Sequence, residues 1–488
     1  MKALSLELDA SIRKLYLRIA AAIRLAIKSG QLQPGEALPS ARKLAMELKT
    51  NRHTVMAAYQ ELIAQSWVES LERRGYRVAR RLPIDSSLEV MRTESEEVSP
   101  FQWPINKRFS QSRPVKPAHE FSYNFAGGMP DIEAFPFKEF KSHMGDSLSR
   151  PSMQNLAYGN NEGCDNFLEQ VKTYLRRVRA LKDKEIIAVN GSQEALFIIA
   201  QLLLKPGDKV AVEALGYKPA WNAFRSSGAC LVPLKQHAKG IDLAHLTKLF
   251  EQENIKLIYL TPLHQYPTTL TIPMHERMEI YALAVRHQVI IVEDDYDHEF
   301  HYLSQPLAPM AADDPSGQVI YLSTFSKIMF PGCRVGFMAV DKSLAPAIIN
   351  YRTIINHKPN VLIQDAIGRW MADGGFERHI RRMTKLYQQR RDHLVELLED
   401  YKKQGIPIAY HLPAGGMALW LDIKHHAQEL EAYCLSNDVY LLSETHFWLE
   451  PEQSENRYIR IGFAGLSSEK LTEGLAIAFD YFLKLQKQ

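Results

Sequence analysis

The segment VIYLSTFSKIMFPGCRVGFMAV, residues 319–340, holds two apolar runs that predict buried β-strands. The polar stretch between them contains Lys327 and, seven residues later, Arg334. Binding sites in open α/β sheets form where strands end, so this position suits a functional lysine. A single lysine after a strand is usually a surface charge. The nearby arginine, a candidate phosphate partner, favours a binding site instead.

A second apolar run with a polar end, IIVEDDYD, occupies residues 290–297. Its carboxylates cannot stay in an apolar core, so the strand is expected to end at a site or at the surface. Asp294 can hold the proton of a pyridine ring, and Tyr296 can donate a hydrogen bond to a hydroxylate on that ring. An acidic metal cluster or a solvated strand end would give the same pattern.

The segment VNGSQE, residues 189–194, precedes an apolar helix expected over 195–204. The Ser192 hydroxyl and the free N–H groups at such a helix start can bind phosphate, although any capped helix has this pattern. With Lys327 and Asp294, the chain offers what a phosphorylated pyridine aldehyde requires. These requirements are a lysine for the imine, a carboxylate for the ring nitrogen and donors for the phosphate.

Arg460 is the one arginine in the apolar run YIRIGF, residues 458–463. Burying an unpaired guanidinium is costly, so we expect a carboxylate partner for this side chain. Either the carboxylate of a bound ligand or a protein Asp or Glu can supply that partner, and the sequence leaves both alternatives open.

Apolar runs alternate with helical patterns from about residue 180 to residue 340. This alternation predicts an α/β fold with a mainly parallel sheet covered by helices. A long charged helix over 376–401, short strands and a final helix over 467–485 then predict a smaller α+β part. The expected strands of the sheet are Ile186–Val189, Val210–Glu213, Lys256–Leu260, Val289–Val292, Val319–Leu322 and Val335–Val340.

The 488 residues carry a net charge of +3, which hides an uneven distribution. Residues 1–82 hold 15 Lys and Arg against 7 Asp and Glu, whereas the remaining residues hold 44 against 49. A basic end on a mildly acidic body indicates binding to a polyanion, although solubilising surface charge is an alternative explanation. The 46% hydrophobic content excludes disorder over the whole chain and a collagen-like structure.

The basic end predicts three helices followed by a hairpin. An amphipathic helix over 15–29 precedes two helices that Ser40 and Asn51 can cap. A two-stranded hairpin with a basic tip at residues 73–75 follows them. This order of elements is typical of a winged helix-turn-helix.

A helix-turn-helix contacts base edges with the first turn of its second helix, while other residues contact the DNA backbone. In that turn, Arg52 can donate to guanine and Thr54 can contact phosphate or a thymine methyl. Taken singly, each arginine is more often a solvated surface residue, but their joint placement favours double-stranded DNA as the partner. The candidate DNA contacts, including the basic wing suited to a minor groove, are Arg42, Asn51, Arg52, His53, Thr54, Arg73, Arg74 and Gly75.

Residues 83–118 carry five prolines and no sustained period, which predicts a linker. The expected domains are residues 1–82 and 119–488, the second with a large part of about 119–341 and a small part of about 342–488. The four cysteines lack CxxC spacing, and the chain shows neither a signal peptide nor an apolar run of about 18 residues. These features predict a cytoplasmic protein without a disulfide framework, metal site or membrane span.

Two known families share these motifs. Residues 12–80 resemble the GntR-type winged helix-turn-helix through LPSARKLA, RHTVMAAYQEL and a wing that ends in RRGY. Residues of about 120–485 resemble the fold-type I aminotransferases that use pyridoxal 5′-phosphate. The motifs of this second resemblance are GSQEAL, TPLHQYPT, VEDDYD, STFSK, PGCR and IRIGF.

The second resemblance implies a PLP-dependent transferase fold with a seven-stranded type of sheet in its large part. It implies Lys327 as the Schiff-base lysine and Arg460 as the partner of a ligand carboxylate. The residues that it places around the cofactor are Lys327, Asp294, Tyr296, Ser192, Gln193, Tyr217, His264, Thr324 and Arg334.

The fusion of these two regions resembles the MocR/GabR regulators from end to end. Membership implies a head-to-tail homodimer that binds operator DNA and senses an amino compound, or pyridoxal 5′-phosphate itself, through the Lys327 Schiff base. It also implies little or no transaminase turnover. The alternatives are an active aminotransferase that also binds DNA, and a DNA-binding protein whose large body has lost the cofactor and serves only for dimerisation.

Overall fold

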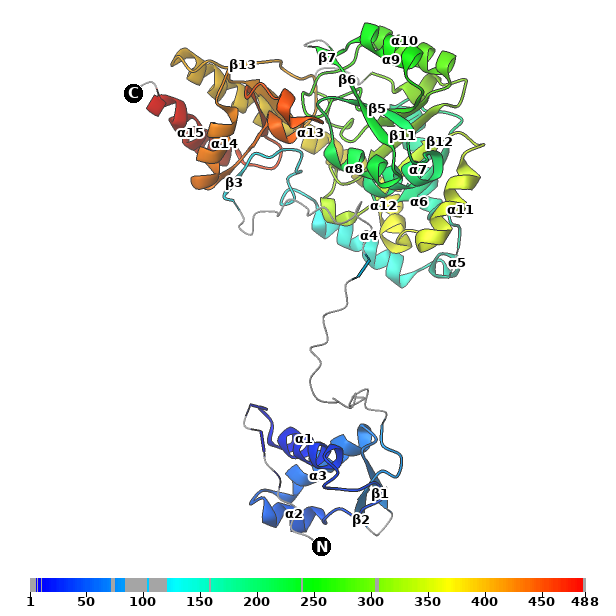
Figure 1. Ribbon diagram of the computed structural model, residues 1–488, viewed down its shortest axis with the longest axis vertical. Coiled ribbons are helices and arrows are strands. Elements are labelled where there is room, and N and C mark those ends of the chain that lie inside the picture. Colours follow the sequence, from blue (N-terminus) through cyan, green and yellow to red (C-terminus); the bar gives the residue numbers. More distant parts are fainter. Residues whose placement is uncertain are drawn as a thin grey trace. The chain divides into compact units, whose positions relative to one another are not determined.

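The computed structural model describes residues 6, 8–9, 11–71, 75–83, 103–104, 121–157, 159–237, 240–302 and 307–485. The chain forms two compact units, Met1–Pro104 and Ile105–Gln488 (Figure 1). No helix in the described ranges is long and apolar enough to cross a membrane. The predicted domain boundaries at residues 82, 118 and 341 stay predictions.

The N-terminal unit contains three helices followed by a two-stranded antiparallel hairpin, which confirms the predicted winged helix-turn-helix (Figure 1). Both expected caps are present, because Lys43 N donates to Ser40 Oγ (3.2 Å) and His53 N donates to Asn51 Oδ1 (2.8 Å). The elements are α1 (Leu15–Lys28), α2 (Ala41–Glu47), α3 (Arg52–Ala64), β1 (Val68–Leu71) and β2 (Gly75–Val78).

The core of this unit fixes the orientation of α3. Val55, Tyr59 and Leu62 of α3 are buried in one apolar cluster with Ile19 and Ile23 of α1. The Tyr59 hydroxyl also donates to the backbone oxygen that precedes the Ser40 cap, at 2.7 Å. One face of α3 is therefore held by packing, and its first turn is left facing solvent.

A seven-stranded sheet forms the centre of the C-terminal unit, in the order β4-β12-β11-β10-β9-β5-β6. All neighbours pair in parallel except β12, which is antiparallel to both β11 and β4. The sheet is therefore mainly parallel, as predicted. Its strands are β4 (Glu185–Val189), β5 (Lys209–Glu213), β6 (Cys230–Leu234), β9 (Ile255–Leu260), β10 (Ile290–Asp294), β11 (Val319–Thr324) and β12 (Gly336–Val340).

Helices cover both faces of this sheet, and alternate residues of each strand enter opposite cores. Ile291 packs with the helices of one face, whereas its neighbour Val292 packs with those of the other. The first face is covered by α6 (Asp165–Val178), α9 (Leu243–Gln252), α10 (Met274–His287) and α12 (Val361–Ala372). The second face is covered by α7 (Ser192–Leu203), α8 (Lys218–Ser226) and α11 (Ala345–Asn356).

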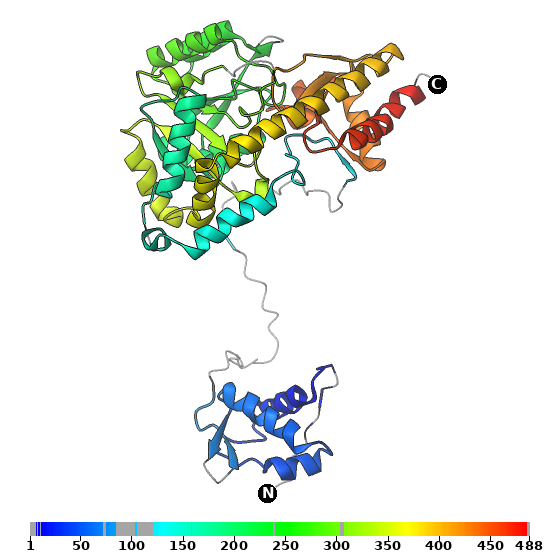
Figure 2. The same cartoon turned by 180° about the vertical axis from the view of Figure 1, so that it is seen from behind.

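A smaller four-stranded sheet of order β13-β14-β17-β16 lies beside the large one. The long helix α13 (Gly375–Lys403) runs from the large part to the small part (Figure 2). The other elements here are β13 (Ala409–Tyr410), β14 (Ala418–Asp422), α14 (Ala427–Ser436), β15 (Val439–Tyr440), β16 (Leu442–Ser443), β17 (Tyr458–Gly462) and α15 (Ser468–Leu485). This arrangement confirms the predicted α+β part.

Strand β3 (Tyr123–Asn124) pairs in parallel with β15 of the small part. The sequence placed these residues in the large part, because a two-residue strand has no periodicity that reveals a distant partner. The chain then enters the large part through α4 (Phe137–Ser149) and α5 (Met153–Leu156). A short hairpin of β7 (Gln236–His237) and β8 (Gly240–Ile241) projects beyond β6.

Candidate functional site

Residues from both parts of the C-terminal unit line a cavity of about 300 Å³. Two of them lie at strand ends, because Asp294 is the last residue of β10 and Thr324 is the last residue of the adjacent parallel strand β11. Nine of the ten residues predicted for cofactor and ligand lie around this one cavity. They are Ser192, Gln193, Tyr217, Asp294, Tyr296, Thr324, Lys327, Arg334 and Arg460.

Asp294 is a buried carboxylate with a hydrogen-bond partner at only one of its two oxygens in the described structure. Its Oδ2 accepts a hydrogen bond from the Tyr259 hydroxyl at 2.8 Å, while Oδ1 has no partner among the described residues. Burial raises the pKa of Asp294 to about 7. The site therefore lacks a cationic N–H donor at this carboxylate, which is what the protonated nitrogen of a pyridine ring supplies.

Lys327 carries an amine suited to attack an aldehyde near neutral pH. Burial, together with the positive charge of Arg460, lowers the pKa of Lys327 to about 8. Its Nζ donates to the backbone oxygen of Gly128 at 2.7 Å. Because this single neutral acceptor holds the amine, no described carboxylate has to be displaced when Lys327 forms a bond.

One end of the cavity is built for an anion. Arg334 has a left-handed backbone (φ 48°), and its Nη2 donates to Asn190 O at 2.8 Å. The helix α7 starts at Ser192 with no side-chain cap on its first N–H groups. Gly191 between them has a left-handed backbone (φ 85°) that favours glycine, and a Cβ there would lie 2.8 Å from Arg334 Nη2 and displace the guanidinium. Free N–H groups, hydroxyls and a guanidinium make this end suitable for a phosphate.

Four tyrosines, Tyr217, Tyr259, Tyr266 and Tyr296, also line the cavity. Tyr217 and Tyr266 meet edge to face at 5.4 Å, and the Tyr296 hydroxyl donates to His264 O at 2.9 Å. Tyr259 and Tyr266 were not among the predicted residues. Tyr259 lies within the apolar run over 255–260 and Tyr266 in the polar stretch over 264–269, and their roles appear only when the strand ends are brought together.

Arg460 is 2% exposed and projects from β17 of the small part. Its Nη1 donates to Ala126 O at 3.3 Å, its Nε has no partner, and it forms no ion pair with any carboxylate in the described part of the chain. The guanidinium carbon lies 4.8 Å from the centre of the Tyr266 ring. This geometry favours the ligand carboxylate over a protein partner.

His264 is the predicted cofactor residue that does not line the cavity. Its Nδ1 pairs with Asp297 at 2.7 Å, and its ring stacks at 6.0 Å from that of His301. Only its backbone oxygen contacts a lining residue, through the Tyr296 hydroxyl. The structure thus gives this side chain a position behind the wall, and its role toward a cofactor stays a prediction.

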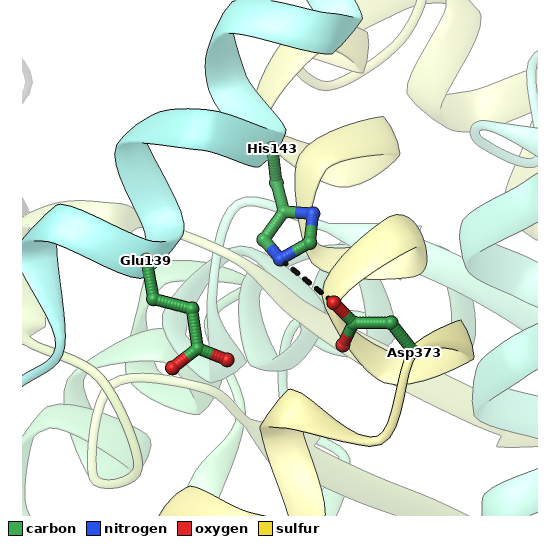
Figure 3. Close-up of side chains that lie close together, drawn as sticks. All are labelled: Glu139, His143 and Asp373. Atoms are coloured by element: carbon green, nitrogen blue, oxygen red, sulfur yellow. Dashed lines mark ion pairs between the residues drawn. The ribbon is translucent and has the colours of Figure 1, made fainter.

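A separate cluster of Glu139, His143 and Asp373 brings three potential metal ligands together (Figure 3). His143 pairs with Asp373 at 3.2 Å, while Arg378 reaches Glu139 at 3.2 Å and Asp373 at 3.9 Å. The Arg378 guanidinium lies within reach of both carboxylates and offsets one of their two negative charges. The cluster is therefore an ion-pair network, and the expectation of no metal stays a prediction.

The predicted DNA contacts in the N-terminal unit lie at the start of α3 and on α2. Arg52 and His53 are exposed in the first turn of α3, Thr54 is half-buried, and Arg42 is exposed on α2. The Asn51 side chain is engaged as the cap. Gly75 begins β2 with φ 99°, a left-handed value that favours glycine. Arg73 and Arg74 lie outside the described residues.

Comparisons with known proteins cover both units. The family Aminotransferase class I and II matches residues 134–477, and Bacterial regulatory proteins, gntR family, matches residues 15–78. The chain is 30% identical to the probable rhizopine catabolism regulatory protein MocR of Rhizobium meliloti, over 99% of this chain and 96% of the relative. The chain belongs to the MocR/GabR-type regulators. The HTH-type transcriptional regulator TauR of Rhodobacter capsulatus is 26% identical over 92% of this chain and 93% of its own.

Solved structures agree with this assignment for the C-terminal unit. A kynurenine aminotransferase of Pyrococcus horikoshii, crystallised with PMP, is 27% identical with a TM-score of 0.68 over 75% of this chain and 92% of its own. The MocR/GabR-type chain is thus a DNA-binding transcription regulator with an aminotransferase-like unit that uses pyridoxal 5′-phosphate. The free Oδ1 of Asp294 fits the ring nitrogen of this cofactor.

Proposed function

We propose that this regulator senses an amino compound, or pyridoxal 5′-phosphate itself, at Lys327 and changes its binding to operator DNA in response. One observation carries the proposal. Asp294 and Arg460 are buried around a single cavity beside the Lys327 amine, and neither has an oppositely charged protein partner in the described part of the chain. Such unpaired charges are costly unless a ligand completes them.

Each predicted residue has a defined task toward the cofactor. Asp294 holds the proton on the pyridine nitrogen, Tyr217 packs on the ring, and Arg334 with Ser192 and Thr324 binds the phosphate. When bound, the cofactor supplies an aldehyde carbon on which a free amine can replace a lysine. Lys327 provides the protein amine and, when displaced, regains a hydrogen bond to Gly128 O.

The effector we propose carries an amine at one end and an acid group at the other. A Cβ placed on Gly128 would lie 3.3 Å from Lys327 Nζ and 4.0 Å from Arg460 Nη2, so the two cations flank the same glycine. An amine that reaches Lys327 can therefore place its acid group on Arg460. Coupling to DNA requires that the effector bind two arrangements of the chain with unequal affinity.

The apolar surface of α4, α5 and α11 supports a homodimer. Five large side chains, on α5 and at the C-terminal ends of α4 and α11, are between 43% and 83% exposed, which is costly on a monomer and typical of an interface. We propose that a second copy covers this surface in a head-to-tail arrangement and that the protein is cytoplasmic. The residues are Leu148, Met153, Leu156, Ile354 and Ile355.

Transaminase activity is the second candidate, because Lys327, the lysine that such a reaction requires, lines the cavity. Two measurements on the purified full chain test cofactor binding and turnover. Visible absorbance that disappears in Lys327→Ala supports the lysine-bound cofactor, and a colourless wild type would contradict it. Steady-state release of keto acid from amines would favour the enzyme, whereas amine-dependent operator binding without turnover supports the regulator.

A further inference from the structure

A second cavity, of about 470 Å³, lies between the large and small parts of the C-terminal unit. It shares no lining residue with the cofactor cavity. The β7–β8 hairpin and the loop over 265–272 line it from the large part, and residues of β13, β14 and β17 line it from the small part. Close to it, Gly216 N donates to Phe447 O and Leu449 N donates to Ala214 O, both at 2.9 Å. These bonds join the two parts.

Glu213, the last residue of β5, lines this cavity and is 1% exposed. Its Oε2 accepts a hydrogen bond from Thr261 Oγ1 at 3.1 Å, while Oε1 accepts none among the described residues. Burial raises the pKa of Glu213 to about 8, against the effect of Thr261 and of the Gln265 side chain. A carboxylate in this position is costly without a cation beside it.

The other acidic residues of the cavity already have partners. Asp422 accepts two hydrogen bonds from Arg457, at 2.9 and 2.6 Å, and Glu455 lies 3.6 Å from the same guanidinium. Glu444 accepts hydrogen bonds from Trp448 Nε1 at 3.1 Å and from Arg457 N at 2.6 Å. Glu213 is therefore the buried lining carboxylate with an oxygen that accepts no hydrogen bond in the described structure.

Aromatic side chains form much of the remaining wall. Trp420 and Tyr458 stack with their rings 5.5 Å apart and an interplanar angle of 9°, and Trp448 and Tyr410 also line the space. Aromatic faces attract both organic cations and apolar groups. We propose that this cavity binds an organic ammonium compound with an apolar body, its ammonium group at Glu213 and its body against Trp420 and Tyr458.

The two cavities share contacts through which such a ligand would act on the cofactor site. Thr261, which donates to Glu213, itself lines the cofactor cavity. A second connection is aromatic, because Phe447 lies 5.7 Å from Trp420 and 5.6 Å from Tyr266, the ring under Arg460. A ligand in the second cavity would thus be a second regulatory signal, separate from amine exchange at Lys327.

Isothermal titration of the full cofactor-loaded protein with N,N-dimethylphenethylamine tests this site. The probe is a tertiary amine, so it carries an ammonium proton but cannot replace Lys327 on an aldehyde. Wild-type protein is expected to bind it, and Glu213→Gln to bind it at least about tenfold more weakly, because a charge-assisted hydrogen bond is lost. Glu455→Gln, a change at an exposed carboxylate of the same cavity, is expected to keep wild-type affinity.

Two further measurements test the proposal if Glu213→Gln does not fold. The uncharged analogue 2-phenylethanol is expected to bind wild type more weakly than the amine, and Lys327→Ala is expected to retain binding of the amine. Absence of binding to wild type at millimolar probe, equal binding of the amine and the alcohol, or loss of binding in Lys327→Ala would each overturn the proposal. Unaltered affinity in a folded Glu213→Gln would do the same.

Discussion

The guanidinium of Arg460 lies over the ring of Tyr266, with 4.8 Å between its central carbon and the ring centre. The two residues come from different parts of the C-terminal unit, Arg460 from β17 and Tyr266 from the loop after β9. Their contact places a buried cation, with no carboxylate partner in the described residues, on the wall of the cavity that contains Lys327. The proposed binding of the effector's acid group depends on this position of Arg460.

Replacing Arg460 should separate effector binding from cofactor binding. We expect Arg460→Ala to weaken the response of operator binding to an effective amino acid by at least about tenfold, because one charged pair is lost. The visible absorbance of the cofactor should persist, since Asp294 and Arg334 are unchanged. Arg460→Lys keeps the charge and should lose less. An unaltered dose response in Arg460→Ala would show that the acid group is bound elsewhere.

The anion-binding end of the cavity can be tested with two forms of the cofactor. Arg334→Ala should lower the affinity for pyridoxal 5′-phosphate by about tenfold or more, because a charge-assisted contact to the phosphate is removed. Affinity for pyridoxal, which has no phosphate, should stay close to that of wild type. Absorbance titrations of cofactor-free protein give both values. Equal losses for both compounds would mean that Arg334 acts on the fold of the cavity instead.

The buried carboxyl of Asp294 predicts a pH dependence of the cofactor-free protein. Its folded pKa, about 7, is raised above the ordinary aspartate value of 3.8, so the folded state keeps a proton that the unfolded state releases. The cost to stability therefore grows as the pH rises from about 4 to about 7 and is constant above that. The melting temperature of Asp294→Asn, relative to that of wild type, should therefore rise as the pH increases across this range. A constant difference would contradict the unpaired carboxyl.

The exposed first turn of α3 should carry operator recognition. Arg52→Ala is expected to weaken specific operator binding by about 1–3 kcal/mol, the range for a good base contact. Arg24→Ala removes an equal charge from α1, where Arg24 donates to Gln65 at 2.9 Å, and serves as the control. Fluorescence anisotropy with a selected genomic fragment measures both. Wild-type affinity and sequence preference in Arg52→Ala would remove its assigned role.

If a second copy covers the apolar surface of α4, α5 and α11, a single charge placed on this surface should weaken the dimer. Ile354 is 83% exposed on one chain, and Ile354→Asp should shift sedimentation from dimer toward monomer because it would bury a charge in the interface. Met278→Asp, at a comparably exposed position on α10, should leave the dimer intact. If both variants sediment like wild type, the second copy is bound through another surface.

Local patterns were sufficient to predict much of the architecture. The caps Ser40 and Asn51 depend on residues two or three positions away, and both form the predicted hydrogen bonds. The strands before Asp294 and Lys327 are continuous apolar runs, typical of strands buried on both faces of a parallel sheet. The rule that sites form at strand ends then predicted which side chains meet.

Features that depend on distant partners were not predicted. Strand β6 is the apolar run CLVPL at the edge of the sheet, and its Pro233 argues against a strand because proline cannot donate a hydrogen bond to a neighbouring strand. The pairing of β3 with β15 joins segments more than 300 residues apart. Glu213 resembles any acidic strand end in the sequence, and its unpaired oxygen becomes visible only when the small part closes the second cavity.

The most direct test of the central claim follows cofactor absorbance and operator anisotropy in the same titration of the full chain with ω-amino acids and aminosulfonates. The account predicts that the compound that changes the visible absorbance also changes operator affinity, at the same concentration, and that both changes disappear in Lys327→Ala. An equal change of operator affinity in Lys327→Ala, or a complete change of absorbance with unaltered operator affinity for every compound, would contradict it.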